Sequence, residues 1–255
     1  MGTFMREWVS LYESKSGERG MFNREASDKQ VAKNGRRETG HAWGTNPCSE
    51  IILRPYQFCN LSEVIVRSDD TLQDLKSKVR VATILGTFQS TLTNFKYLRK
   101  IWKQNTEEER LLGVSLTGIM DHPVLSKTTD STRWLKEMKE EAVLTNQKYA
   151  KLLGIPQSAA ITCVKPSGTV SQLTNSASGI HARHSPYYVR TVRADNNDPL
   201  TKLMKDEGVV NEPDVMKPDY TTVFSFPTRS PVDAVVRSEV SAIEQLELWK
   251  IYADI

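Results

Sequence analysis

Two stretches of the chain carry the apolar spacing of long amphipathic helices. In residues 72–102 apolar side chains recur at intervals of three and four, which predicts one helix over this range. The positions on that apolar face are Leu75, Val79, Ala82, Leu85, Phe88, Leu92, Phe95, Leu98 and Trp102. A second helix is predicted from about Thr132 to Leu153. Gly154 and Pro156 are expected to end it, because glycine adopts the left-handed cap conformation and proline cannot continue the hydrogen-bond ladder.

Two Ser/Thr-x-x-Glu motifs predict further helix starts. The motif at Thr106 is expected to open a short helix that runs into residues 113–119, where two glycines indicate a turn or close packing. The motif at Ser241 opens a last helix, and the chain stops three residues after Tyr252 on the apolar side of that helix. Because this helix has only begun to bury aromatic side chains, we expect the chain to be a piece of a larger protein.

Three shorter stretches have the character of strands. Residues 159–164 form an apolar run that suits a buried strand, and residues 187–193 alternate in part, as a half-buried strand does. Residues 221–226 are rich in β-forming residues. Residues 13–46 are instead rich in Gly, Ser, Asn, Lys and Arg, so we expect an irregular segment that covers the surface like a lid.

The composition is that of a folded globular protein. The 255 residues are 38% hydrophobic and 25% charged, which excludes a disordered polymer, a collagen-like repeat and a disulfide-rich mini-protein. Lys and Arg exceed Asp and Glu by 34 to 31, and so small an excess indicates no direct binding to nucleic acid or to a membrane surface.

The sequence shows no membrane or export signal. No run approaches the ~20 apolar residues that span a bilayer, and residues 1–24 lack the apolar core of a signal peptide. The three cysteines, Cys48, Cys59 and Cys163, are an odd number that fits no closed disulfide framework. We therefore expect a reducing, cytoplasmic setting.

The candidate chemistry concentrates in residues 46–50, Asn-Pro-Cys-Ser-Glu. Pro47 biases the residue before it toward extended backbone. In an extended chain Asn46, Cys48 and Glu50 share one face, with neighbouring Cβ atoms about 7 Å apart, so that an amide, a thiol and a carboxylate can act on one small substrate. A nearby carboxylate raises the pKa of a thiol, which favours a cysteine used as a hydrogen-atom donor over a thiolate nucleophile. On this motif alone, a cysteine in an ordinary loop remains the alternative.

Two further motifs strengthen the case for chemistry. Residues 58–61, Phe-Cys-Asn-Leu, add a second thiol at Cys59. Residues 165–169, Lys-Pro-Ser-Gly-Thr, follow the predicted strand at 159–164 and precede a polar stretch of helical character. The backbone N–H groups of such a turn can cradle a phosphate, although the Walker A spacing is absent. A common Ser/Gly turn without a ligand remains the alternative for this motif.

Together these motifs resemble the catalytic motifs of ribonucleotide reductase large chains, and the adenosylcobalamin-dependent (class II) branch is the most similar. Five longer stretches carry the resemblance across nearly the whole chain: SLYESKSGERGMFNRE at 10–25, RLLGVSLTGI at 110–119, PSGTVSQL at 166–173, GIHARHSPYYVRTVR at 179–193 and AIEQLELWK at 242–250.

The resemblance implies an α/β fold, part of a ten-stranded α/β barrel whose central finger loop, near residues 44–60, carries the radical cysteine. Cys48 matches that cysteine. In this family adenosylcobalamin yields a radical that takes hydrogen from the thiol, and the thiyl radical then abstracts the 3′-hydrogen of the ribonucleotide. By the same resemblance, Glu50 removes the 3′-hydroxyl proton and Asn46 hydrogen-bonds the ribose.

The resemblance also implies a source of reducing electrons and a binding site for the nucleotide phosphates. Loss of the 2′-hydroxyl as water takes two electrons from a cysteine pair, of which Cys59 matches one member, and a thioredoxin-type protein or a dithiol reduces the pair again. The phosphate loop at 165–170 holds the nucleotide phosphates through Pro166, Ser167, Gly168 and Thr169. The implied product is a 2′-deoxyribonucleotide for DNA synthesis. Ribonucleoside triphosphates are the favoured substrates, and diphosphates remain open.

Parts of the family pattern have no counterpart in this sequence. The partner of Cys59, the N-terminal effector and early-barrel region, and the C-terminal redox tail are absent, so residues 1–255 match a partial catalytic barrel domain. Cys163 lies in an apolar run, where we expect a buried, inert thiol. Half a barrel leaves strand edges unpaired, so we expect a complementing reductase chain, and aggregation without it.

Two other functions stay open. The first is a non-catalytic nucleotide-binding fragment or assembly subunit, although such a module would tend to lose Cys48, Glu50 or Cys59. The second is a thiolate transferase, which is disfavoured because no basic residue lies within two positions of Cys48.

The remaining conspicuous side chains are histidines and arginines. His181 and His184 have no Cys or carboxylate partner at ligand spacing, so we predict no metal site there. Arg183, Arg190 and Arg193 are expected either to line an anionic nucleotide or cofactor region or to lie on a solvated face.

Overall fold

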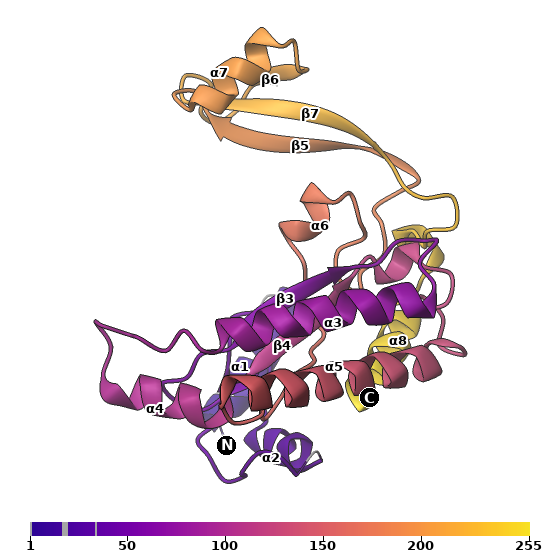
Figure 1. Cartoon of the computed structure of the whole chain (residues 1–255). Coiled ribbons are helices and arrows are strands. Elements are labelled where there is room, and N and C mark those ends of the chain that lie inside the picture. Colours follow the sequence, from indigo (N-terminus) through magenta and orange to yellow (C-terminus); the bar gives the residue numbers. More distant parts are fainter. Residues whose placement is uncertain (1, 17–19, 34) are drawn as a thin grey trace.

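Figure 1 shows the computed structural model of the chain, which describes residues 2–16, 20–33 and 35–255. What the sequence predicts for residues 1, 17–19 and 34 lies outside this part. The elements are α1 (Gly2–Ser14), α2 (Arg24–Ala32), β1 (Gly44–Thr45), β2 (Ile52–Leu53), β3 (Asn60–Ile65), α3 (Leu72–Gln89), α4 (Lys100–Glu109), β4 (Leu112–Thr117), η1 (Ile119–Asp121), α5 (Ser131–Leu153), α6 (Val170–Leu173), β5 (Tyr187–Asp195), α7 (Pro199–Asp206), β6 (Asn211–Pro213), β7 (Thr221–Arg229), η2 (Arg237–Glu239) and α8 (Ala242–Asp254).

The centre of the molecule is the parallel pair β3 and β4, paired in register from Asn60 opposite Leu112 to Ile65 opposite Thr117. Helix α3 packs on this pair, and α5 packs against α3 (Figure 1). The main core includes Val64 of β3, Leu75 of α3 and Met138 of α5. Apolar side chains on matching faces of strand and helix therefore bury one another.

The predicted strand at 159–164 runs beside the free edge of β4. Backbone N–H groups of Leu112 and Val114 donate to the carbonyls of Ala160 and Ile161 at 2.9 and 2.8 Å. One parallel bridge joins Thr162 to Val114. The segment is extended as predicted, but it makes too few regular ladder contacts to form a full strand.

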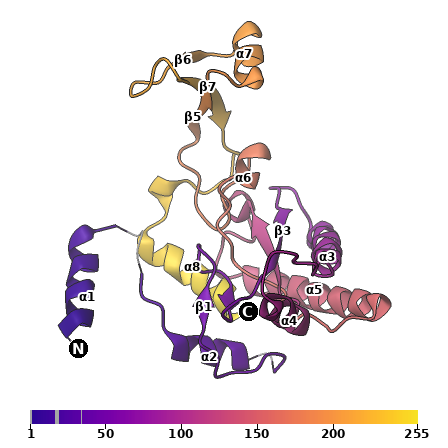
Figure 2. The same cartoon turned by 90° about the vertical axis from the view of Figure 1, so that its left-hand side faces the viewer.

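An antiparallel arm projects from the body of the molecule (Figures 1 and 2). Its strands β5 and β7 pair along nine residues each, and β6 pairs with the outer end of β7. The strands predicted at 187–193 and 221–226 are confirmed, and both continue further than their sequence patterns indicated. Pairing extends them, because each backbone group in one strand finds its partner in the other.

The two helix ends predicted from glycine and from a capping box are confirmed. Gly154 has φ +66° and its N–H donates to Ala150 at the end of α5. At the start of α8 the Ser241 hydroxyl accepts from the N–H of Glu244, whose carboxylate accepts from the N–H of Ser241 at 2.7 Å.

The single helix predicted over 72–102 is wrong beyond residue 89. The hydroxyls of Ser90 and Thr91 donate to the carbonyls of Thr87 and Phe88 at 2.6 and 2.7 Å, which competes with continuation of the helix. The side chain of Arg110 also donates to the carbonyl of Ser90 at 2.6 Å. Helix α4 then begins ten residues later, at Lys100.

The predicted capping box at Thr106 is also wrong. Thr106 lies within α4, which ends at Arg110 with a left-handed φ of +43°. The carboxylate of Glu109 is buried and pairs with Arg37 and Arg54, so it is not free to cap a helix start. The glycine-containing stretch that follows is β4 and a turn at Gly118, where φ is +87°.

The irregular segment predicted at 13–46 contains a helix. Its residues 24–32 form α2, and the side chain of Asn23 caps this helix by accepting from the N–H of Ala26 at 3.1 Å. The apolar face of α2 is narrow, with only Ser27 and Val31 buried, so the hydrophobic pattern alone did not reveal it.

The described residues form a mixed α/β structure with three separate sheets, of two, two and three strands. Across these ranges the strands close no ten-stranded barrel. No helix in the described ranges is long and apolar enough to cross a bilayer.

Candidate functional site

The motif at 46–50 forms the turn of the β1–β2 hairpin. The N–H of Ser49 donates to the carbonyl of Asn46 at 3.0 Å, and Ser49 has a φ of +63°. The side chain of Asn46 accepts from the N–H of Ile51 at 3.1 Å. The extended conformation predicted for this motif is therefore wrong. Pro47 occupies the second position of the turn, where its fixed φ favours a bend.

The turn gives the thiol and the carboxylate different exposure. Cys48 is exposed at the tip of the hairpin. Glu50 is directed inward, and its side chain is only 1% exposed. The shared face predicted for Asn46, Cys48 and Glu50 does not form, because alternation holds only in a continuous extended strand.

Glu50 forms an ion pair with the residue that precedes the predicted phosphate loop. The ammonium nitrogen of Lys165 lies 2.7 Å from Oε1 of Glu50. Burial acts to raise the pKa of Glu50, but the hydrogen bonds from Lys165 and Asn46 outweigh it, so this pKa lies below its ordinary value. The other oxygen, Oε2, is buried and has no hydrogen-bond partner among the described residues. Glu50 is therefore ionised and keeps one acceptor oxygen free.

The carboxylate of Glu50 acts electrostatically on the thiols of Cys59 and Cys163. Burial and, next, repulsion by Glu50 raise the pKa of Cys59, and the same two causes raise the pKa of Cys163 to about 12. Both thiols are partly buried and pack against the small apolar cluster around Ile51.

Gly113 in β4 allows this packing. A Cβ atom at Gly113 would lie 2.4 Å from a methyl carbon of Leu61 and 3.2 Å from the sulfur of Cys163. A side chain here would displace Leu61 and press on Cys163, in agreement with the predicted close packing.

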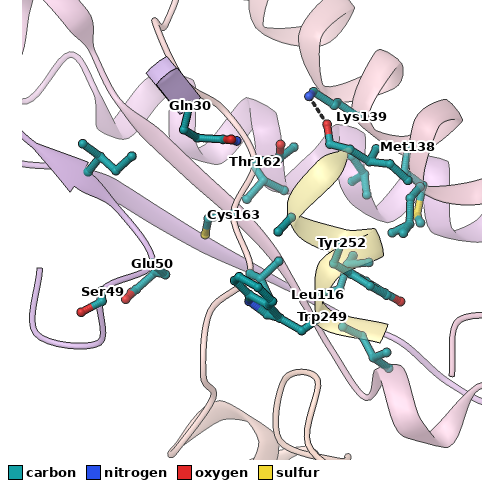
Figure 3. Close-up of a pocket in the computed structure, with 18 residues that line it drawn as sticks. Gln30, Ser49, Glu50, Leu116, Met138, Lys139, Thr162, Cys163, Trp249 and Tyr252 are labelled. Atoms are coloured by element: carbon teal, nitrogen blue, oxygen red, sulfur yellow. Dashed lines mark hydrogen bonds between the residues drawn. The ribbon is translucent and has the colours of Figure 1, made fainter. Parts of the chain in front are cut away.

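A cavity of about 430 Å³ lies beside Glu50 and Cys163 (Figure 3). Trp249 and Tyr252 of α8 and Met138 of α5 also line it. Sequence reasoning placed Cys163 in an apolar run and missed its position on this cavity. The sequence signal for this position was that Cys163 lies two residues before Lys165, at the start of the predicted phosphate loop.

The phosphate loop is folded around Ser167. Ser167 is buried, and its hydroxyl accepts from the N–H of Ser171 at 3.1 Å, while its carbonyl accepts from the hydroxyls of Ser171 and Ser178. Gly168 and Thr169 are exposed. The predicted helical stretch is a single turn, α6, so any anion here depends on local N–H and hydroxyl groups rather than on a helix dipole.

The chain beyond the loop is anchored by a buried ion pair. Arg183 donates to both oxygens of Asp121 at 2.8 and 2.7 Å, and to the carbonyl and side chain of Asn175 at 2.8 and 3.0 Å. Asp121 also accepts from the N–H of Ala177 at 2.7 Å. Arg183 is 3% exposed, so neither prediction for it, a nucleotide-lining arginine or a solvated face, is right.

The other side chains considered from sequence lie outside this centre. Arg193 pairs with Asp214 on the arm, and Arg190 lies over the ring of Tyr188. The ring of His181 bonds the carbonyl of Ser178. Within the described ranges no three His, Cys, Asp or Glu side chains group in a way that could hold a metal ion.

No protein-family model matches the chain. It is 30% identical, over 87% of its length, to the adenosylcobalamin-dependent ribonucleoside-triphosphate reductase of Lacticaseibacillus paracasei. The protein of the same name from Lactobacillus gasseri is 31% identical over 75% of the chain, and that from Euglena gracilis is 29% identical over 80%. The chain spans 33%, 29% and 28% of these proteins.

A solved structure agrees with these sequence matches. A B12-dependent (class II) ribonucleotide reductase superimposes with a TM-score of 0.68 over 82% of this chain and 33% of its own, at 24% identity. The likeness to that structure is one of fold. In both comparisons the chain covers about a third of the protein that it matches.

Proposed function

From the homology of this chain to about a third of the adenosylcobalamin-dependent ribonucleoside-triphosphate reductases, we propose that it contributes part of the catalytic barrel of such an enzyme. Residues 1–255 form this part, with the finger loop near 44–60 and the phosphate loop at 165–170. The reaction is the reduction of ribonucleotides, chiefly triphosphates, to 2′-deoxyribonucleotides in the cytoplasm. A thioredoxin-type protein or a dithiol is the final reductant.

One observation carries the proposal: the ion pair between Glu50 and Lys165 joins the cysteine hairpin to the phosphate loop. These two motifs lie 115 residues apart in the sequence. A nucleotide whose phosphates contact the loop would therefore have its sugar near Glu50.

Cys48 is the residue that we assign to the hydrogen-atom step. Adenosylcobalamin, when bound, would supply the radical chemistry that removes the hydrogen atom from the Cys48 thiol. The exposed position of Cys48 at the tip of the turn fits a thiol that must be reached from outside the hairpin. As a thiyl radical, Cys48 takes the 3′-hydrogen of the ribose.

Glu50 and Asn46 act on the ribose hydroxyls. The ionised Glu50 takes the 3′-hydroxyl proton on its unpartnered oxygen, Oε2. The side-chain oxygen of Asn46 accepts from Ile51 and one N–H of its NH₂ group acts on Glu50, so the second N–H can donate to a ribose oxygen.

Cys59 supplies reducing equivalents. Replacement of the 2′-hydroxyl by hydrogen, with release of water, takes two protons and two electrons, which two thiols provide as they form a disulfide. The raised pKa of Cys59 keeps it protonated and therefore able to supply hydrogen. Its partner thiol is assigned to a complementing reductase chain.

Reconstitution tests the proposal. The chain, alone and mixed with the polypeptides encoded beside it, is supplied with ribonucleoside triphosphates, adenosylcobalamin and a dithiol, and deoxynucleotide is measured. We expect product in the mixture and at most a trace from the chain alone.

Two variants serve as controls. Cys48→Ser in the same mixture should give no product while folding normally, because its side chain is exposed. Cys59→Ser should allow at most one turnover. Nucleotide binding without product in every mixture would instead support a non-catalytic nucleotide-binding subunit.

A further inference from the structure

Lys165 lies at the junction of the two motifs and has no role in the proposed reaction so far. Its ammonium nitrogen contacts Glu50 at 2.7 Å, and the next residue in the chain, Pro166, opens the phosphate loop. The side chain of Lys165 is 25% exposed, whereas that of Glu50 is 1% exposed. The pair therefore has a buried acidic end and a basic end that reaches the surface beside the loop.

The ammonium group has bonding capacity left. An ammonium carries three N–H donors, and the contact with Glu50 Oε1 uses one of them. A phosphate oxygen on the neighbouring loop can therefore take a second donor, and it then competes with Glu50 for the charge of the ammonium. Lysine is a usual phosphate ligand because it acts as a compact point charge.

The groups around Glu50 make the lysine charge important there. The thiols of Cys59 and Cys163 face the carboxylate, and Glu63 acts on Cys163 from β3. Asn46 contributes a neutral amide. When the ammonium is drawn away from Glu50, burial disfavours the charge of the carboxylate, and only the amide of Asn46 and the backbone N–H of Glu50 remain to stabilise it.

We propose that Lys165 is a positioning residue that divides its ammonium between Glu50 and a nucleotide phosphate, so that phosphate binding and protonation of Glu50 are coupled. This inference rests on the proposed function, because it takes residues 165–169 to be the phosphate site. Coupling of this kind is reciprocal. Phosphate on the loop favours the protonated form of Glu50, and a neutral residue 50 strengthens the binding of phosphate.

In the proposed reaction the coupling has a direct use. Glu50 is held ionised by Lys165 until a nucleotide binds, and it becomes a stronger proton acceptor once phosphate competes for the ammonium. The carboxylate then takes the 3′-hydroxyl proton only when substrate is in place.

Binding of inorganic tripolyphosphate and of ATP to the purified 255-residue chain tests the coupling, measured by calorimetry. Lys165→Met should weaken binding of both about tenfold, which corresponds to one charge-assisted contact. Lys165→Arg keeps the charge and should restore most of the affinity. Glu50→Gln should bind both about fivefold more tightly, because it releases the ammonium for phosphate.

The double variant Lys165→Met/Glu50→Gln separates coupling from a structural role. It should bind like Lys165→Met alone, since the gain from Glu50→Gln requires the lysine. A purely structural ion pair would instead make both single variants bind more weakly. That result, or a Glu50→Gln variant with unchanged affinity, overturns the inference.

Ser167→Ala distinguishes the inference from the proposed function. Weaker binding by Ser167→Ala together with unchanged binding by Lys165→Met leaves the phosphate loop in place and removes the role of Lys165. Absence of tripolyphosphate and ATP binding, by the unmodified chain alone and by its mixture with the complementing chain, overturns both.

Discussion

At the scale of single residues, the carboxylate of Glu50 sets the character of its neighbours. It is buried, ionised and paired with Lys165, and its negative charge adds to the effect of burial on Cys59 and Cys163. These two thiols stay protonated at neutral pH, whereas Cys48 lies outside on the turn. The three cysteines therefore differ in chemistry although the sequence offers little to tell them apart.

This difference predicts their reactivity. Iodoacetamide at pH 8 should alkylate Cys48 first and Cys163 on the order of a hundredfold or more slowly, because the thiolate is the reactive form and a pKa of about 12 leaves little of it. Peptide mass spectrometry over time measures both rates. Cys48→Ser is the matched control and should leave the slow rate at Cys163 unchanged. Equal rates at the two positions would contradict the assigned environment of Cys163.

At the scale of elements, the phosphate loop is held where two segments meet closely. Gly179 has φ +55°, and a Cβ atom there would lie 2.6 Å from the backbone oxygen of Lys165. Further on, the Asp121–Arg183 pair bonds the chain at Asn175 and Ala177. The backbone position of Lys165 therefore depends on residues beyond the loop as well as on the strand before it.

Gly179→Ala should displace the loop. We expect a loss of stability of roughly 2 kcal/mol or more, from left-handed strain together with the clash against backbone. Gly154→Ala is the control, since it has a similar φ of +66° but open space around it, and should cost about 1 kcal/mol. Urea unfolding gives both values, and weaker ATP binding by Gly179→Ala alone is expected. Equal losses of stability in the two variants would show that the close contact of residue 179 with the backbone of Lys165 does not add to the cost.

The elements also show where local patterns suffice. The end of α5 and the start of α8 follow from signals within a few residues. Gly154 ends α5, and the capping box at Ser241 begins α8. The helix predicted over 72–102 fails after Gln89, although its apolar spacing continues. Leu92 shows why: it fits the helical period, yet it is exposed in the structure. Periodicity predicts a face and does not establish that a partner covers that face.

At the scale of the whole molecule, the described residues leave much apolar surface uncovered. The arm exposes Tyr187, Val189 and Met216, and β3 pairs on one side only, with β4. Unpaired strand edges and apolar faces favour association. The proposed complementing chain would cover such surfaces in a complete barrel.

The chain alone should therefore associate in solution. Size-exclusion chromatography with light scattering should show a mass that rises with concentration, and addition of the complementing chain should replace these species by one defined complex. A monomer of 28.9 kDa at all concentrations would contradict the half-barrel interpretation.

The sequence by itself determined the reactive groups and their local settings. It placed Asn46, Cys48 and Glu50 in one motif and the hydroxyls of Ser167 and Thr169 in another, and its ordered motifs led to the family that the comparisons support. These features depend on neighbours within a few positions, so they can be read from the order of residues.

Only the tertiary structure decided which of these groups meet. The turn at Pro47 leaves Cys48 exposed and Glu50 buried, and packing brings Glu50 to Lys165 across 115 positions. In the same way Asp121 meets Arg183 across 62 positions. Such contacts depend on how helices and strands bury one another as a whole. A short-range pattern carries no information about the register in which distant segments pack.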